Sequence, residues 1–328
     1  QALRRTPLFE AHRARGARMA PFGGWEMPIQ YPTGILAEHM ATRRGAGLFD
    51  VSHMGRFRIV GARAADFLQH ALTHNVHLLV PGRAQYNLIA CPDGGTVDDC
   101  YLYCLAQGEY LLVVTAANSA KDRLHLEEIR RERFADGTSM EDATEETTML
   151  ALQGPASEEA LRAALARLGI ADALPKRGRN NLLRSSWDGD EFLSARTGYT
   201  GEPVCFELFA PSARAADLWD ALLATDARAG REAVYPAGLG ARNTLRTEAG
   251  LPLYGHELGP EISGIAAGLH ALAIRLVDKG SDFVGREALL AEYLRGSAAR
   301  VVPFVLEGRG RAARDDDLVV RDGERVGR

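Results

Sequence analysis

The chain has 328 residues, 46% of them hydrophobic, and a formal net charge of −4. This length is sufficient for two or three domains with cores of their own. The slight acidic excess gives no reason to expect nucleic acid or a membrane surface as a partner. No apolar run approaches the roughly 20 residues that span a bilayer, and the N-terminal sequence lacks the apolar core of a signal peptide.

The four cysteines show neither zinc-ligand nor disulfide-framework spacing, so we expect reduced thiols and a cytoplasmic location. Lys121, Lys176 and Lys279 are the only lysines among 39 basic residues. The arginines are scattered, which indicates the coding bias of a genome, here predicted to be bacterial, rather than a binding surface.

The N-terminal part is dense in glycine and proline. Between residues 21 and 32 this density excludes a long helix and predicts an irregular segment that is pinned by its aromatic side chains. Thr33 is predicted to cap a helix over residues 34–44. His53 follows, without a second metal-ligating residue at ligand spacing, so we interpret it as a hydrogen-bonded structural histidine rather than a base or metal ligand.

The remaining elements follow from periodicity and turn residues. In the first half we predict strands at 57–60, 86–91, 98–105 and 110–115, a helix at 62–72, and a helix that Asn118 or Ser119 caps and that ends near residue 133. In the second half we predict strands at 147–152 and 205–209, a strand pair around the connection 196–202, a helix that Ser157 caps and that ends at Gly169, and helices from Ser212 and at 238–250. A strand–helix–strand–strand–helix order therefore occurs twice and predicts an α+β fold with two related modules.

The C-terminal part is predicted to be a third, all-β module. A helix from Gly285 to Leu294 leads to strands at 301–306 and 317–320, and Asp322-Gly323 predicts a hairpin turn. Since Arg328 leaves this module in mid-strand, we expect it to be incomplete.

Two adjacent carboxylates, Asp98 and Asp99, follow a Gly-Gly turn and begin a β-rich run. Neighbouring strand residues point to opposite faces, so we expect one carboxylate to be solvated and the other to face the apolar side. A carboxylate beside Tyr101 and Tyr103 could act as an acid, a base or a cation stabiliser. The alternative from these residues alone is a hairpin with two surface acids.

Several separated segments, taken together and in order, resemble the T-protein family of the glycine cleavage system, aminomethyltransferases that use tetrahydrofolate. The matching segments are 24–28, 47–55, the glycines 94–95 with Asp98-Asp99, 196–202, and 238–250 followed by 253–257. The resemblance extends from about residue 6 to residue 328.

The resemblance implies a three-domain cloverleaf with a central folate channel. Its domains would be 1–54 with 140–265 on the pterin side, 55–139 with the catalytic aspartate, and the incomplete β-barrel-like module 285–328. It implies a lipoylated H-protein as partner, whose aminomethyl group yields ammonia, 5,10-methylenetetrahydrofolate and the reduced arm.

The resemblance also assigns site residues. It places Asp99 near folate N10 as the catalytic acid, and Glu207 at the pterin. The positions implied to line the folate channel are Met54, Tyr86, Tyr103, Tyr199 and Arg242. No metal is implied.

The residue types suit this chemistry. One carboxylate can accept two parallel N–H bonds from a pterin edge, and tyrosine and methionine side chains can wall a flat ring. Loss of ammonia from the aminomethyl thioether gives an iminium-like or thionium-like centre that a folate nitrogen attacks. An ionised Asp99 would stabilise this positive charge or accept the proton.

Alternative interpretations stay open at this point. Glu207 could be an exposed strand residue, and Arg242 a surface charge on a helix, a partner of the folate tail carboxylates, or a group that orients Asp99. The chain also departs from the family pattern: the segment 202–207 is one residue longer, Thr115 replaces a common Asn, and 268–272 lacks an aromatic residue.

These departures favour one alternative function, a folate-dependent demethylase of a small methylated compound on the same fold. A non-catalytic folate-binding relative is a further alternative, and loss of the acidic pair would be its mark. Both acids are present.

Overall fold

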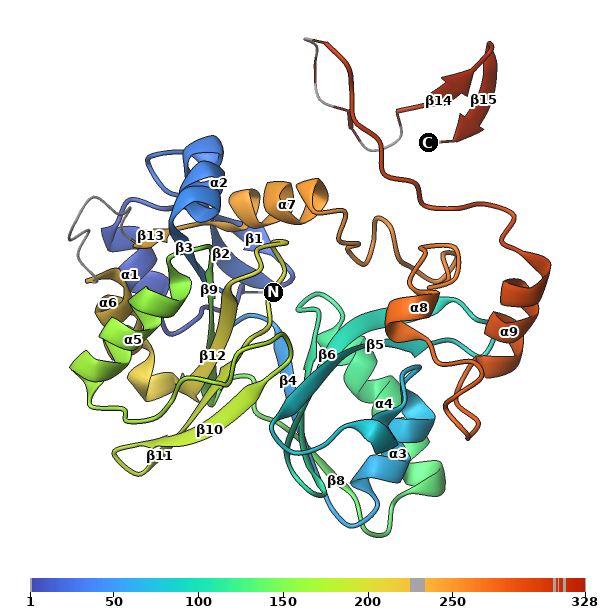
Figure 1. Ribbon diagram of the computed structural model, residues 1–328, viewed down its shortest axis with the longest axis horizontal. Coiled ribbons are helices and arrows are strands. Elements are labelled where there is room, and N and C mark those ends of the chain that lie inside the picture. The colour runs from blue at the N-terminus through green and yellow to red at the C-terminus, as the bar shows by residue number, and fades with distance from the viewer. Residues whose placement is uncertain (1, 225–233, 309–310, 312, 315–316, 328) are drawn as a thin grey trace.

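Two β-sheets form the body of the protein in the computed structural model, which describes residues 2–224, 234–308, 311, 313–314 and 317–327 (Figure 1). The six-stranded sheet consists, in spatial order, of β10 (Leu182–Trp187), β11 (Asp190–Ala195), β12 (Cys205–Pro211), β9 (Thr147–Gln153), β3 (Ala46–Asp50) and β13 (Val234–Pro236). The five-stranded sheet consists of β5 (Arg83–Ala90), β6 (Thr96–Ala106), β7 (Glu109–Val114), β4 (Gly55–Val60) and β8 (Ser139–Asp142). Neighbouring strands are antiparallel except β13 and β3.

Helices and two short strand pairs surround the two sheets. The described α-helices are α1 (Phe9–Ala14), α2 (Ile35–Arg44), α3 (Ala64–Ala71), α4 (Ser119–Arg133), α5 (Ser157–Leu168), α6 (Ala215–Leu223), α7 (Leu239–Glu248), α8 (His270–Ala273) and α9 (Arg286–Arg295). Short 3₁₀ turns are η1 (Val76–Leu78) and η2 (Ser212–Arg214). Two further pairs of strands form small antiparallel sheets: β1 (Arg18–Phe22) with β2 (Trp25–Gln30), and β14 (Val319–Arg321) with β15 (Glu324–Gly327).

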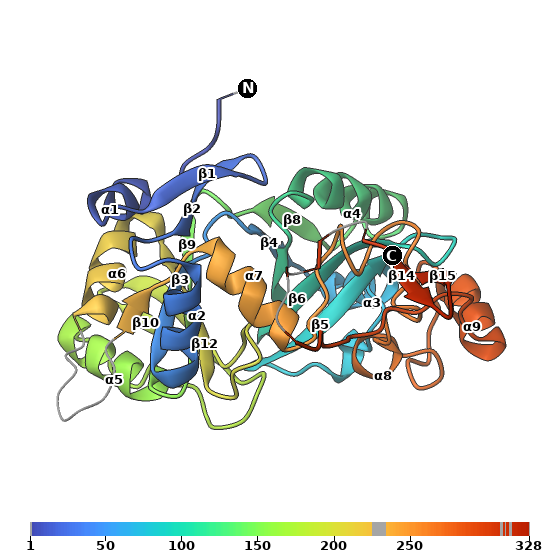
Figure 2. The ribbon, with the colours of Figure 1, turned by 90° about the horizontal axis from the view of Figure 1, so that it is seen from above.

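Three apolar clusters give the molecule its layers. Helices α5 and α6 pack on one face of the six-stranded sheet, around the fully buried Trp219. Helices α3 and α4 pack on the outer face of the five-stranded sheet, around Phe57 and Phe67. A third cluster joins the inner faces of the two sheets and includes Phe49 of β3, Tyr103 of β6 and residues of α7. The inner faces are therefore the place where side chains from both sheets meet, and Figure 2 shows α7 beside this boundary.

The two sheets repeat one connectivity. The order β4-α3-β5-β6-β7-α4-β8 in the first corresponds to β9-α5-β10-β11-β12-α6-β13 in the second. The spatial orders also correspond, except that β3 is inserted between β9 and β13. This bears out the predicted α+β class and a repeated order of elements, with two more strands in each repeat than the predicted order contains.

Most predicted elements are confirmed to within a few residues, among them α2, α3, α4, α5, α7 and the strands β4 to β7. The predicted caps are wrong. Gly34, with a φ of 84°, precedes α2 in place of Thr33, and Ala156 precedes α5. Asn118 does precede α4, but its side chain makes no cap bond and binds Asp98 instead.

The segment predicted to be irregular near the N-terminus is a β-hairpin, β1 and β2, that turns at Gly23-Gly24. Its prolines are tolerated because a two-stranded ribbon has two edges, where an absent N–H does not break a ladder. The tip lies against the five-stranded half of the molecule, since a Cβ on Gly23 would stand 3.3 Å from that of Ala116.

The C-terminal prediction is correct only in part. The hairpin β14–β15 forms, with Asp322 and Gly323 at φ values of 55° and 83°. Residues 301–306 form no strand and are exposed. The hairpin β14–β15 lies apart from both sheets in Figure 1. No helix among the described residues is long and apolar enough to cross a membrane.

Candidate active site

The side chains of strand β6 alternate between the two faces of its sheet. Asp98 and Cys100 point toward α4 and the outer core, whereas Tyr101 and Tyr103 belong to the cluster between the sheets. Asp99 shares the inner face with these tyrosines. The expectation that the two acids point to opposite faces is therefore confirmed.

Asp99 is partly buried, and its Oδ2 atom accepts a hydrogen bond of 3.1 Å from the hydroxyl of Tyr86 on β5. Burial and the adjacent charge of Asp98 raise the pKa of the Asp99 carboxyl to about 7, against the opposing effects of the Tyr86 bond and the Arg242 charge. A carboxyl group with such a pKa can both accept and release a proton near neutral pH.

The expectation that one acid of the pair is solvated is wrong. Asp98 is completely buried. Its Oδ1 accepts a 2.7 Å bond from the amide of Asn118, and its Oδ2 accepts a 2.8 Å bond from the backbone N–H of Thr115. The loop between β7 and α4 supplies both donors, so a polar side chain is satisfied on the face that otherwise contacts α3 and α4.

Glu207 lies on β12, in the six-stranded sheet, with only 5% of its surface exposed. Its Oε2 atom accepts a 2.7 Å bond from Tyr103 and a second bond from the hydroxyl of Thr197. Among the described residues, no hydrogen bond reaches Oε1. The interpretation of Glu207 as an exposed strand residue is therefore wrong.

A row of three tyrosines links the surroundings of the two acids. The ring centroids of Tyr86 and Tyr101 are 6.1 Å apart, and those of Tyr101 and Tyr103 are 5.5 Å apart. The first hydroxyl of the row binds Asp99 and the last binds Glu207. The acids, 108 positions apart in the chain by their numbers, thus lie at the two ends of one array.

Arg242, on α7, is a cation whose charge acts on both acids. Its guanidinium carbon lies 5.0 Å from the ring centroid of Tyr199, and its Nη2 atom lies 3.9 Å from the sulfur of Met54. Burial lowers the pKa of Arg242, and the charges of Glu207 and Asp99 oppose this effect. Its Nη1 atom is buried without a partner in the described part of the chain, so Arg242 is not a surface charge.

The corner between β3 and β4 supplies Met54 and is held by a buried arginine. The guanidinium of Arg56 donates to the carbonyl oxygens of Met54 and Ser52. His53 lies in the same corner, and burial lowers its pKa to about 3, so the ring is neutral. Its Nδ1 atom has no partner among the described residues, which contradicts the prediction of a hydrogen-bonded histidine.

The seven predicted residues thus gather at the boundary of the two sheets, and their roles remain a proposal. The sequence did not single out three further side chains: Thr197 at Glu207, Asn118 at Asp98, and Asn180, which accepts a bond from the Tyr101 hydroxyl. Thr197 stands in the matched segment 196–202, which could have identified it. Asn118 and Asn180 have no such signal.

Two departures from the family pattern have a structural counterpart. Thr115 donates its backbone N–H to Asp98 at 2.8 Å, and its side chain also hydrogen-bonds to Asp98. Glu202, in the lengthened segment, pairs with Arg43 at 2.6 Å. Glu207 lies opposite Ala151 in the β12–β9 ladder, whose register has no irregularity.

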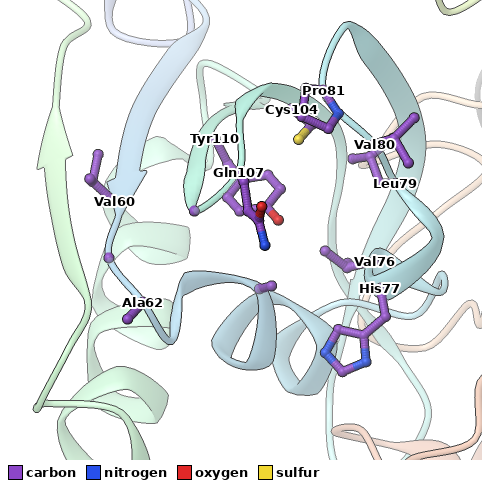
Figure 3. Close-up of a pocket in the computed structure, with 13 residues that line it drawn as sticks. Val60, Ala62, Val76, His77, Leu79, Val80, Pro81, Cys104, Gln107 and Tyr110 are labelled. Carbon is purple, nitrogen blue, oxygen red and sulfur yellow. The ribbon is translucent and has the colours of Figure 1, made fainter.

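A surface groove of about 790 Å³ lies elsewhere, on the outer side of the five-stranded sheet (Figure 3). Cys104, Tyr110 and Val76 line it, and none of the seven predicted residues does. No group of three or more metal-ligating side chains occurs among the residues that the structure describes.

Comparison with known proteins gives consistent matches. The family model described as the GCVT N-terminal domain matches residues 8–276. An aminomethyltransferase of Rubrobacter xylanophilus is 47% identical over 325 residues, which cover 99% of this chain and 82% of that protein. An aminomethyltransferase of Thermus thermophilus is 42% identical over 327 residues, covering 99% of this chain and 86% of that protein.

Among solved structures, the glycine cleavage system aminomethyltransferase T of Bartonella henselae has a TM-score of 0.78 and 35% sequence identity. The similarity covers 90% of this chain and 76% of that one. The residues matched by the family model, 8–276, contain all strands of both sheets.

Proposed function

The chain belongs to the glycine cleavage T-protein family, and we propose that it catalyses aminomethyl transfer from a lipoylated H-protein to tetrahydrofolate. The single observation that best supports this reaction is the array between the sheets. Asp99 and Glu207 lie at its two ends, and the charge of Arg242 acts on both. The products are ammonia, 5,10-methylenetetrahydrofolate and the dihydrolipoyl arm.

The polar atoms of the array fit a folate. The unpartnered Oε1 atom of Glu207 can accept the N–H groups of an amino-pyrimidinone edge. The buried Nη1 atom of Arg242 lacks a partner in the described chain, and such an atom is costly unless a ligand or water satisfies it. The rings of Tyr86, Tyr101 and Tyr103 offer flat apolar surfaces between the acids. When bound, the folate would supply the two nitrogens to which the transferred carbon becomes bonded.

The proton balance of the reaction defines what Asp99 has to do. Two new N–C bonds form, while one C–N and one C–S bond break. The acceptor loses two N–H protons, of which one ends on ammonia and the other on the thiol of the arm. A group that accepts and then returns a proton near neutral pH meets this need.

Asp99 has the properties of such a group. Its pKa of about 7 leaves it partly ionised near neutral pH. The ionised form stabilises the positive charge that develops when ammonia leaves, and it accepts the N–H proton of the attacking nitrogen. The protonated form then gives this proton to a leaving group. The Tyr86 hydroxyl holds the carboxylate in place at 3.1 Å.

The proposal includes the setting of the reaction. An arm-borne substrate requires a partner protein, and the lipoylated H-protein is the partner that this donor implies. All four cysteines are free in the structure, which agrees with a reducing compartment, and we place the protein in the cytoplasm of a bacterium.

The Asp99→Asn variant tests the proposal. With aminomethyl-loaded H-protein and tetrahydrofolate, we expect turnover to fall by roughly 10²–10⁴-fold, the usual contribution of one acid–base or electrostatic group. Ammonia release measures the rate. Asp93→Asn is the matched control, because Asp93 is an exposed acid on the turn before β6; it should keep normal turnover. Near-normal turnover of Asp99→Asn would refute the assignment.

The same assay distinguishes the proposed donor, the loaded H-protein, from the small methylated compound of the demethylase alternative. The three departures from the family pattern favoured a demethylase, whereas the regular pairing of β12 with β9 holds Glu207 at the array between the sheets. We therefore expect turnover with the loaded H-protein and none with free methylated amines. The opposite result would establish a folate-dependent demethylase.

A further inference from the structure

A buried pair of acids lies directly behind Asp99, on the other face of β6. Asp98 is completely buried, and each of its oxygens accepts one short hydrogen bond, from Asn118 and from Thr115. Asp122, in the first turn of α4, is also completely buried. The two carboxyl groups are hydrogen-bonded to each other, and neither oxygen of Asp122 accepts a hydrogen bond from an N–H group or a hydroxyl in the described part of the chain.

The surroundings decide which acid of the pair is charged. Burial, and then the charge of Asp98, raise the pKa of Asp122 to about 10, so Asp122 holds a proton at neutral pH. Burial also raises the pKa of Asp98, but hydrogen bonds from Asp122, from Asn118 and from Thr115 oppose this effect and favour the ionised form of Asp98. The pair thus contains one proton and one negative charge, and the charge is on Asp98.

This fixed charge is next to the group that we assign to proton transfer. Asp98 and Asp99 are neighbours on one strand, and their carboxylates are separated by the thickness of the sheet. Few other groups face Asp99. Tyr86 donates to it from β5, Arg242 and Tyr199 act on it across the sheet boundary, and the Cys100 thiol follows it on β6.

We propose that Asp98 is a positioning residue that sets the proton affinity of Asp99, and that Asp122 keeps the charge of the buried pair at one. This inference rests on the proposed function, since it assigns a purpose to the base strength of Asp99. A negative charge close behind the strand disfavours a second negative charge on Asp99. Asp99 therefore binds the proton of the attacking nitrogen more firmly than an isolated aspartate would, and still returns it near neutral pH.

The structural arrangement explains why the charge stays in place. Asn118 would be expected to cap α4, and instead its amide donates to Asp98 at 2.7 Å. Lys121, on the same turn of α4, binds the carbonyl oxygen of Val97 and the hydroxyl of Tyr254 instead of pairing with Asp98. Among the described contacts, the charge of Asp98 is thus met by neutral donors only and is not cancelled by a cation.

The pH dependence of turnover tests this proposal. In Asp98→Asn we expect the acidic limb of the profile to move to lower pH by about one unit, the usual order for a near like charge. Asp122→Asn should leave the midpoint in place, because it replaces a protonated acid by a neutral amide of the same shape. Asp93→Asn is the control for removal of an exposed charge from the same hairpin. A slower Asp98→Asn enzyme with an unchanged midpoint would overturn the proposal, as would an equal shift in Asp93→Asn.

A second measurement does not depend on turnover. The carboxyl carbon of Asp99, followed by NMR in protein labelled at aspartate, should titrate at lower pH in Asp98→Asn than in the unchanged protein. If Asp98→Asn does not fold, Asn118→Ala serves instead, because loss of one donor weakens the ionised form of Asp98 and should move the titration the same way by a smaller amount. An unchanged titration overturns the inference even where the enzyme is active. Inactivity toward the loaded H-protein with a shifted titration would refute the proposed function alone.

Discussion

Glu207 and Asp99 are both strand carboxylates near the sheet boundary, but their surroundings prepare them for different tasks. Two hydroxyls, from Tyr103 and Thr197, donate to one oxygen of Glu207. Asp99 receives one hydroxyl, from Tyr86, and has the charge of Asp98 behind it. A like charge favours the protonated form of a carboxyl group, which suits Asp99 to proton transfer. The two hydroxyls that donate to Oε2 orient the Glu207 carboxyl group and leave its Oε1 atom as an acceptor for a ligand.

Replacement of Glu207 by Gln should mainly weaken folate binding. The amide still accepts at one oxygen, but its NH₂ group opposes the N–H groups of the ligand. Hydrogen bonds to a charged group contribute about 1.5–3 kcal/mol, so we expect the Kd for tetrahydrofolate to rise by roughly 10–150-fold. Titration calorimetry measures this Kd. Glu141→Gln, an exposed residue of β8, is the control, and an unchanged Kd in Glu207→Gln would show that the pterin is not bound there.

At the scale of elements, the start of β6 is fixed by a close contact with a distant segment. The N–H of Thr96 donates to the carbonyl of Gly259 at 3.0 Å, and its hydroxyl donates to the carbonyl of Ile262 at 2.9 Å. A Cβ on Gly95 would stand 2.0 Å from the carbonyl oxygen of Pro260. Glycine is thus required at position 95 by the approach of two backbones, and this contact places the start of the strand that contains both acids.

Gly95→Ala should therefore destabilise the protein, since the 259–262 segment has to move away from β6. Overpacking of this kind costs about 1–3 kcal/mol, which should lower the midpoint of urea unfolding and also reduce turnover. Gly259→Ala is a matched control on the other side of the same contact, because a Cβ there meets nothing within 4 Å. Equal stability of the two variants would contradict this account of the contact.

At the scale of the whole molecule, a buried polar network ties the N-terminal region to the six-stranded sheet. Asp50, at the end of β3, accepts bonds from Thr6 at 2.6 Å, from the backbone N–H of Ser52 at 2.9 Å and, at 2.9 Å, contacts Nε2 of His12. The hydroxyl of Tyr31 lies 2.9 Å from the other nitrogen of His12. Segments from four parts of the chain thus depend on one buried carboxylate.

This network predicts a specific loss of stability in acid. Burial alone would raise the pKa of Asp50, but the hydrogen bond and charge of His12 outweigh it and lower the pKa from 3.8 to about 2. A carboxyl with a lowered pKa in the folded state stabilises the protein above its unfolded-state pKa. That stabilisation, about 2 kcal/mol, is lost as the pH falls from about 4 to about 2.

Asp50→Asn should accordingly be less stable than the unchanged protein at neutral pH, and the difference should shrink by about 2 kcal/mol near pH 2. Urea unfolding midpoints at the two pH values measure the change. Asp220→Asn removes an exposed acid, with 68% of its side chain accessible and an ion pair to Arg15 at 3.2 Å, and is the control for the loss of a surface charge. A constant difference for Asp50→Asn would show that Asp50 does not titrate as the network requires.

Local sequence signals predicted most elements and some site residues, and the errors have identifiable causes. Periodicity and glycine positions predicted the strands around Asp98 and Asp99 and the helix that contains Arg242. The hairpin β1–β2 was not predicted, because a high density of glycine and proline excludes a long helix but does not distinguish an irregular segment from a two-stranded ribbon, whose edges tolerate proline. Thr33 and Asn118 were predicted as caps because helix capping involves residues that are close in the chain. The side chain of Asn118 instead donates a hydrogen bond to Asp98, which is 20 positions away.

The sequence by itself determined the alternation of β6, the α+β repetition and, through the matched segments, the family and its seven expected site residues. The tertiary structure alone decided that Asp98 is buried and not solvated, that Thr197 and Asn180 join the array, and that Asp99 and Glu207 lie at the two ends of one row of tyrosines. The reason is physical. Alternation and capping depend on neighbours in the chain, whereas burial, pKa and the meeting of two sheets depend on which distant segments exclude water from a side chain.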